Sequence, residues 1–206
     1  MKVEIFSDVV CPWCYIGHKR FARAAARHAG VVEVTYRPFE LNPTATAEGE
    51  PLLEALRRKF GGDVAQMTSR VAAVGAEEGL ELHFDRAVSA NSFEAHRLIE
   101  LASRRGLGAP MTERLFAAHF TDGLNIADSE VLAKLAAEVG VSDTGEAGDE
   151  VREQLGRARE LGITGVPFFL FEGEFGVSGA QPEETFLAAL EEVAERTGRR
   201  AAPRAR

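Results

Sequence analysis

The sequence predicts an α/β fold in which a small sheet is interrupted by a large all-helical insertion. Three features lead to this prediction: a β-α-β pattern at the start, a β-β-α pattern at the end, and about a hundred residues of helical periodicity between them. The two cysteines of the chain, Cys11 and Cys14, stand where the first predicted strand gives way to the first predicted helix. A dithiol at such a junction is typical of a redox site.

Residues 1–40 carry the opening pattern. Apolar and polar residues alternate over residues 3–5, and a short polar break then leads to the cysteines. Pro12 suits the first turn of a helix, because an N–H group at that position would have no partner within the helix. Helical spacing continues to about residue 28 and ends at Gly30, after which residues 32–36 alternate as a half-buried strand does.

The central block consists of successive helical segments with glycines at their ends. Capping residues precede several of them, as Asn91 or Ser92 does before residue 93. The expected helices span residues 51–60, 64–78, 93–105, 112–120, 131–139 and 148–161.

The closing half contains two short apolar segments and a final helix. Residues 168–171 and 175–177 predict a hairpin, and a helix is expected after Pro182, ending near Arg196. A β-α-β unit followed by a β-β-α unit is the order of a thioredoxin-like fold.

These patterns divide the chain into three parts. Residues 1–40 and 162–198 are expected to form the thioredoxin-like domain, and residues 41–161 the helical insertion. Residues 199–206 are rich in arginine and are expected to be a disordered basic tail.

Composition limits the classes of function. The 206 residues are 45% hydrophobic, which is enough to bury a sizeable core, and the net charge of -8 argues against a nucleic-acid partner. No apolar run approaches the roughly 20 residues that span a bilayer, and Glu4 and Asp8 interrupt the apolar core that a signal peptide would need. We therefore expect a cytoplasmic protein without a membrane partner, in a reducing compartment that disfavours a purely structural disulfide.

Cys11 is expected to act as a nucleophile, and Cys14 to resolve the mixed disulfide that Cys11 forms. The thiolate is the reactive form in disulfide exchange, and the positive end of the helix dipole favours a thiolate on Cys11. Cys14 lies one helical turn further along and is expected to be less exposed. Pro12 and Trp13, between the cysteines, tune the redox potential, and an exposed Trp13 would contact the substrate.

Two other roles for the cysteines are less favoured. A structural disulfide would close too small a loop to constrain the unfolded chain much. A zinc site could use His18, one turn beyond Cys14, but a closed structural site needs about four ligands and the chain has no second cysteine pair. The motif and its context therefore favour redox chemistry without a metal.

The peptide bond between Val166 and Pro167 is expected to be cis. It follows Gly165 and precedes a run of four apolar residues in the closing half of the fold. A cis bond here would present the backbone of Val166 to Cys11, where it could pair with an extended substrate, and would keep an N–H group away from the thiolate.

Several segments together resemble the FrnE-like branch of the DsbA family, over residues 3 to 195. They are Phe6-Ser7-Asp8, Cys11-Pro12-Trp13-Cys14-Tyr15-Ile16-Gly17, Arg37-Pro38-Phe39, Leu41-Asn42-Pro43, Asn91 with Ala95-His96-Arg97-Leu98, Gly165-Val166-Pro167-Phe168-Phe169 and Ser178-Gly179-Ala180-Gln181. The resemblance implies a thioredoxin fold with a helical insertion, dithiol–disulfide oxidoreductase activity, a cis bond at Pro167 and a redox pair at Cys11 and Cys14.

The chain also departs from well-known branches of this family. Periplasmic DsbA proteins carry a signal peptide and usually a His before the second cysteine, whereas Trp13 stands there in this chain. Kappa-class glutathione transferases and 2-hydroxychromene-2-carboxylate isomerases share the fold branch but generally have Ser where Cys11 stands. Some relatives accompany polyketide biosynthesis, so a small-molecule role stays open.

Asp8 precedes the dithiol and has two interpretations. It is expected to be a loop or capping acid in water, which is favoured, or else a proton acceptor for Cys14 or a residue that tunes both thiols. Asn91 is expected to cap an insertion helix. His96, on the same helix, is expected to pack or hydrogen-bond on a helix face, although this helix could cover the active site.

Gly179 and Gln181 precede the last helix. They could bind a carboxylate, such as that of glutathione, at the helix N-terminus, or they could serve only as ordinary capping residues.

Three functions are considered. The favoured one is a dithiol–disulfide oxidoreductase that acts on protein or small thiol substrates and is recycled by a redox partner. The second is a glutathione-dependent transferase or isomerase of an aromatic or polyketide-like small molecule, and the third is a non-catalytic chaperone module. Retention of both thiols favours the first, because a transferase needs no Cys14. No bound cofactor is expected, glutathione is a candidate co-substrate, and the protein would be a monomer or a homodimer.

Overall fold

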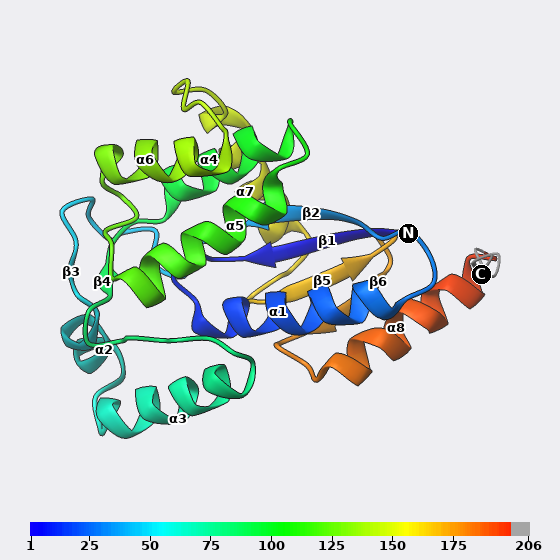
Figure 1. The fold of residues 1–206 in the computed structure, drawn as a ribbon, viewed down its shortest axis with the longest axis horizontal. Coiled ribbons are helices and arrows are strands. Elements are labelled where there is room, and N and C mark those ends of the chain that lie inside the picture. The colour runs from blue at the N-terminus through cyan, green and yellow to red at the C-terminus, as the bar shows by residue number, and fades with distance from the viewer. Residues whose placement is uncertain (199–206) are drawn as a thin grey trace.

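The structure is a computed structural model that describes residues 1–198. The expected basic tail, residues 199–206, lies outside the described residues. Figure 1 shows a central sheet with helices on both of its faces and further helices beyond one end of it.

The sheet joins the two ends of the chain. Its strand order is β2-β1-β5-β6. β1 (Lys2–Ser7) runs parallel to β2 (Glu33–Pro38) and antiparallel to β5 (Phe168–Phe171), and β5 pairs antiparallel with β6 (Phe175–Ser178). The predicted α/β thioredoxin-like fold with a helical insertion is thereby confirmed.

Alternation along β1 directs its side chains into two hydrophobic layers. Ile5 belongs to the large core that also includes residues of α1 (Pro12–Arg27) and α8 (Glu183–Arg196). Phe6 points to the other face, where it packs with residues of α7 (Gly148–Glu160). Helices therefore cover both faces of the sheet, and β1 is buried between them.

Aromatic rings hold α1 and α8 to the sheet. The ring of Phe169 on β5 lies 5.2 Å from that of Phe21 on α1 and 4.4 Å from that of Phe186 on α8. All three side chains are buried, as is Phe171. Phe169 and Phe171 of β5 therefore belong to the main hydrophobic core.

The remaining helices lie between β2 and β5 in the sequence. They are α2 (Leu52–Phe60), α3 (Val64–Glu77), α4 (Phe93–Ser103), α5 (Gly108–Ala117) and α6 (Ser129–Val139), followed by α7. Figure 1 shows α2 and α3 at the end of the molecule toward which β1 points.

Two details differ from the sequence prediction. α5 begins at Gly108 rather than at residue 112, because Pro110 fits the first helical turn, where its missing N–H group needs no partner. The helix then continues into a π-helical turn, Ala118–Asp122. β3 (Glu50–Pro51) and β4 (Val88–Ser89) form a second small sheet, and strands of two residues are too short to show alternation.

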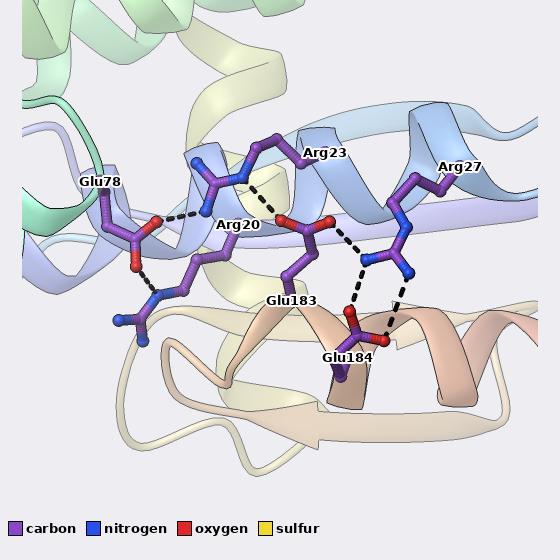
Figure 2. A network of polar contacts seen from close by, with 6 residues as sticks. All are labelled: Arg20, Arg23, Arg27, Glu78, Glu183 and Glu184. Carbon is purple, nitrogen blue, oxygen red and sulfur yellow. Dashed lines mark hydrogen bonds and ion pairs between the residues drawn. The ribbon is translucent and has the colours of Figure 1, made fainter.

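A network of ion pairs fixes the end of α3 to α1 and α8 (Figure 2). Glu78, which follows α3, accepts hydrogen bonds from Arg20 and Arg23 of α1. Arg23 and Arg27 also bind Glu183 in the first turn of α8, at 2.7 Å each. Carboxylates are stabilised at a helix N-terminus, so the network also suits the dipole of α8.

We predict that Glu78→Gln lowers the free energy of unfolding by about 1–2 kcal/mol, because the change leaves two guanidinium groups facing a neutral amide. Burial alone would raise the pKa of Glu78, but hydrogen bonds from Arg23 and Arg20 outweigh it and hold the pKa below the ordinary 4.5. The stabilisation is therefore present above that pH and is lost as the pH falls through the lowered pKa.

Urea unfolding at neutral and acidic pH measures this effect. Glu77→Gln is the matched control, because Glu77 is exposed and adjoins Glu78 in the sequence. Equal losses of stability in the two variants would contradict the structural role of Glu78.

Candidate active site

Cys11 is the N-cap residue of α1. Its backbone is extended, and Pro12 takes the first helical position. The amides of Cys14 and Tyr15 donate to the Cys11 carbonyl at 3.1 and 3.3 Å, so the chain turns directly from the loop into the helix. The first turn and the positive end of the helix dipole therefore lie next to the Cys11 sulfur.

The Val166–Pro167 peptide is cis, as predicted, and it faces the dithiol. The Cys11 Sγ lies 3.9 Å from the Val166 carbonyl oxygen. Both cysteines are free thiols and both are buried, with 4% of Cys11 and 1% of Cys14 exposed. Trp13, between them, is 41% exposed, which agrees with the exposure predicted for it.

Two glycines allow this loop to pack against α1. A Cβ on Gly17 would lie 3.1 Å from the Cγ of Pro167, closer than an ordinary van der Waals contact. The amide of Gly179 donates to the Pro167 carbonyl at 2.8 Å, and Gly179 adopts a positive φ of 82°. Nothing in the sequence alone indicates this role of Gly17, since only the tertiary contact with Pro167 shows it.

Burial raises the pKa of the Cys14 thiol well above its ordinary value. Contact with the Cys11 sulfur acts in the same direction, because a thiolate on Cys11 is stabilised by a protonated Cys14. The negative charge of Asp8 adds to the shift, although its backbone opposes it by a hydrogen bond. The two thiols therefore have different surroundings: burial favours a protonated Cys14, while Cys11 adjoins the positive end of the helix dipole.

Asp8 lies beneath the dithiol and is fully buried, so its interpretation as an acid in water is wrong. Its Oδ2 accepts from the amide of Leu41 at 2.7 Å, and its Oδ1 lies 3.5 Å from Nε2 of His96. The segment after β2 covers Asp8 and supplies the hydrogen bond that the carboxylate needs. A buried carboxylate close to Cys14 fits the alternative interpretation, a proton acceptor.

His96 and Asn91 hold this covering segment in place. Nε2 of His96 lies 3.0 Å from the carbonyl oxygen of Phe39, which can only accept, so this nitrogen carries the proton. The side-chain oxygen of Asn91 accepts from the amide of Phe93 at 2.9 Å, which is the predicted capping role. Its amide nitrogen reaches the Pro43 carbonyl at 3.3 Å.

Gln181 lies on the same connection as Gly179, ahead of α8. Its side-chain amide donates to the carbonyl of Ser178 at 2.8 Å. The first turn of α8 carries Glu183 and Glu184, whose carboxylates already place negative charge at this helix N-terminus. Of the two residues, Gly179 adjoins the dithiol through Pro167.

His18 contributes to packing rather than to the dithiol. Its Nδ1 lies 2.7 Å from the hydroxyl of Tyr36, and its Nε2 lies 3.5 Å from a carboxylate oxygen of Glu113. A hydrogen bond from His18 lowers the pKa of Glu113 to about 2. Within residues 1–198, no three His, Cys, Asp or Glu side chains are grouped so that they could hold a metal ion.

A pocket of about 650 Å³ opens beside Cys11. Cys11, Pro12, Trp13 and Val166 form one wall. The opposite wall comes largely from α2 and α3, whose residues the sequence analysis did not assign to the site. The spacing of their apolar residues predicts an apolar face on each helix, but it does not indicate which surface that face contacts.

His119 is a buried titratable residue that the sequence analysis also missed. It lies in the π-helical turn after α5 and is fully buried, and neither ring nitrogen has a hydrogen-bond partner in the described part of the chain. Burial lowers the pKa of His119 to about 4, and the charge of Asp8 opposes this shift. π-Helical turns are frequent at functional sites, and this one places an ionisable ring near the acid beneath the dithiol.

A thioredoxin-like sheet with a dithiol at the start of its first helix defines the class of protein. Within that class the chain belongs to the DSBA-like thioredoxin domain family, whose model matches residues 2–191. The chain is 28% identical over 201 residues to the uncharacterized protein YwbO of Bacillus subtilis (strain 168), which covers 92% of this chain and 96% of that protein.

Solved structures show the same relationship. A probable DsbA oxidoreductase from Streptomyces coelicolor is 35% identical, with a TM-score of 0.86 over 100% of this chain and 94% of that one. A 2-hydroxychromene-2-carboxylate isomerase shares the fold, with a TM-score of 0.74 and 17% identity over 96% of this chain and 98% of its own. Cytosolic disulfide reductase DsbM from Pseudomonas aeruginosa, solved with GSH, also shares the fold, with a TM-score of 0.65, 22% identity, and coverage of 95% and 100%.

None of the helices in residues 1–198 has the length and apolar character needed to cross a membrane.

We predict that His119→Leu makes the protein less sensitive to acid. His119 of the unfolded chain binds a proton as the pH falls below 6.5, whereas the folded state keeps His119 neutral down to about pH 4. Stability is therefore lost between those two values, by about 2 kcal/mol at pH 5 relative to neutral pH. Urea unfolding at pH 7 and pH 5 should show this additional loss in the wild type and not in the variant, whereas parallel losses would contradict it.

Proposed function

We propose that the protein is a dithiol–disulfide oxidoreductase of the FrnE-like branch of the DsbA family. The observation that carries the proposal is the position of Cys11, at the N-terminus of α1 with its Sγ 3.9 Å from the Val166 carbonyl. A thiolate at this position can attack a disulfide, and the adjacent carbonyl can accept a hydrogen bond from an extended substrate backbone. Cys14, protonated and in contact with Cys11, is placed to complete the exchange.

The reaction proceeds in two exchanges. The Cys11 thiolate attacks one sulfur of the substrate disulfide, the substrate S–S bond breaks, and the other substrate sulfur leaves as a thiolate. Cys14 then loses its proton and attacks the Cys11 sulfur, which releases the second substrate thiol and forms the Cys11–Cys14 disulfide. The dithiol is oxidised by two electrons and the substrate is reduced by two, and the reverse sequence transfers a disulfide to a substrate.

Asp8 is the proposed proton acceptor for Cys14. Its support is burial beneath the dithiol and its electrostatic effect on the Cys14 thiol. The Leu41 amide donates to the Asp8 Oδ2 at 2.7 Å and Nε2 of His96 lies 3.5 Å from the Asp8 Oδ1, so the buried carboxyl group has polar partners within the protein. Asp8 can therefore receive the proton when Cys14 becomes the nucleophile.

The proposal includes the substrates and the setting. Protein or low-molecular-weight thiols and disulfides are the substrates, a redox partner recycles the pair, and the protein acts in the cytoplasm as a monomer or homodimer. Glutathione is the proposed co-substrate, supported by a fold relative, DsbM, that was solved with GSH. Gly179 and Gln181 near Pro167, and Asn91 and His96 on the opposite side, are the candidate contacts.

Reduction of insulin disulfides by dithiothreitol tests the activity. We predict that the wild type accelerates the reaction and that Cys11→Ser abolishes the acceleration, because the nucleophile is lost. Reduced Cys14→Ser, incubated with insulin after dithiothreitol has been removed, should accumulate a mixed disulfide on Cys11 that mass spectrometry detects, since neither Cys14 nor an external thiol is present to resolve it. A wild type no faster than Cys11→Ser would refute the proposed function.

A further inference from the structure

The pocket beside Cys11 has the dimensions of a small-molecule site. Its volume of about 650 Å³ lies within the range of about 300–1,000 Å³ that such sites occupy. Cys11 contributes to its wall and is only 4% exposed, so a disulfide must approach the sulfur through this space or along the Val166 loop. The pocket therefore determines which disulfides can present a sulfur to Cys11.

The walls of the pocket are predominantly apolar. α2 and α3 turn two apolar faces toward it, which include Leu52, Leu56 and Phe60 from α2 and Met67 and Val71 from α3. Phe84 adds a further aromatic surface. These residues recur at helical spacing, so each helix gives the pocket a continuous apolar face.

Exposed apolar side chains gather at the same place. Six large hydrophobic residues are exposed within residues 1–198, and four of them line this pocket: Trp13, Leu41, Phe60 and Met67. Phe60 alone is 60% exposed. Concentrated exposed apolar surface marks a binding site, because it is costly to leave in water.

The charged residues that line the pocket are Glu50, Arg58 and Lys59. Arg58 forms an ion pair with Glu50, so these two charges compensate each other. Lys59 has no carboxylate partner in the described part of the chain, and its ammonium lies 5.5 Å from the ring of Phe60. The pocket thus carries one uncompensated positive charge in a chain whose net charge is -8.

We propose that this pocket binds a low-molecular-weight disulfide with an apolar body of aromatic size and a carboxylate, and presents its sulfur to Cys11. The apolar body would lie between α2 and α3, and the carboxylate would pair with Lys59. This inference rests on the proposed function and specifies its substrate class. Two exchanges reduce the disulfide to two thiols and oxidise Cys11 and Cys14 to their disulfide, so electrons and sulfur atoms balance.

Peptide-like disulfides fit this pocket less well. Oxidised glutathione has peptide groups that need hydrogen-bond partners when they leave water. The Thr68 hydroxyl in the wall already donates to the carbonyl of Val64 at 2.9 Å, and the side-chain oxygen of Asn42 accepts from Thr44 at 3.0 Å. The remaining surface offers mainly carbon atoms, which favours an aromatic body.

The test uses rates of oxidation of the reduced full-length protein by four probes. They are 5,5′-dithiobis(2-nitrobenzoic acid), an aromatic acid; 4,4′-dithiodipyridine, a neutral aromatic; oxidised glutathione; and hydroxyethyl disulfide, which is small and polar. Because intrinsic reactivity differs among probes, the measured quantity is the ratio of two rates within one protein, compared between variants and wild type.

Two variants change the pocket, and each has a matched control, on the same helix for the charge reversal and on the neighbouring helix α3 for the added ring. Lys59→Glu reverses the charge in the pocket, and Arg57→Glu makes the same change on an exposed residue outside it. Ala55→Phe fills the space, and Ala65→Phe adds the same ring to an exposed position of α3 that does not line the pocket.

We expect Lys59→Glu to lower the ratio of two oxidation rates, that with the aromatic acid over that with the neutral aromatic, by about tenfold. The loss of one charge pair in a partly apolar site would have this effect. Ala55→Phe should lower the oxidation rate with each aromatic probe, relative to the rate with hydroxyethyl disulfide, by about tenfold or more. The new ring would fill the space that the aromatic probes need. The controls should leave each ratio within about twofold of the wild type.

The outcomes separate this inference from the proposed function. If no probe oxidises the wild type faster than Cys11→Ser, the proposed function itself fails. If hydroxyethyl disulfide reacts but pocket variants and controls give the same ratios, only the pocket assignment is overturned. The pocket assignment would also be overturned if Ala55→Phe lowered the rate of insulin reduction more than the rates of oxidation by the aromatic probes. The pocket would then bind a side chain of a polypeptide.

Discussion

The contact between the N-terminus of α1 and the Val166–Pro167 loop is the constraint on which the site depends. The loop belongs to the closing half of the chain, and it reaches Cys11 because β5 pairs with β1. Gly17 allows Pro167 to approach α1, and Gly179 fixes the loop from the other side. The sheet therefore brings a carbonyl from residue 166 next to a thiol from residue 11, and the helix supplies the dipole at the same point.

Burial distinguishes the ionisable groups around the start of α1. Cys14, Asp8 and His119 are all buried there. Burial raises the pKa of Cys14 and lowers that of His119, whereas a hydrogen bond from the Leu41 amide and the proximity of His96 give the Asp8 carboxyl group polar partners.

The helices that complete the pocket pack against the same hydrophobic core as α1: Leu52 of α2 is buried in it, and Val71 of α3 contacts it. Glu78 and the arginines of Figure 2 also connect the end of α3 to α1, and β3, which precedes α2, pairs with β4. Two parts of the fold thus meet at the pocket: the sheet and α1 hold the sulfur atoms, and α2 and α3 provide the apolar surface that we propose a substrate contacts. Changes in these helices can alter the substrate without moving Cys11.

The sequence by itself determined the fold class, most helix positions, the dithiol at the start of α1 and the cis bond before Pro167. These features depend on local patterns: alternation, helical spacing, and proline and cysteine at particular positions. Tertiary structure alone decided that Asp8 is buried rather than in water, that Gly17 adjoins Pro167, and that His119 lies without a hydrogen-bond partner near Asp8 in the described chain. The pocket, too, is formed only in the tertiary structure, because its walls include residues 11, 60, 84 and 166, which lie far apart in the sequence. Burial of a polar residue and contact between distant segments leave no periodic trace in a single sequence, and for that reason only the folded chain reveals them.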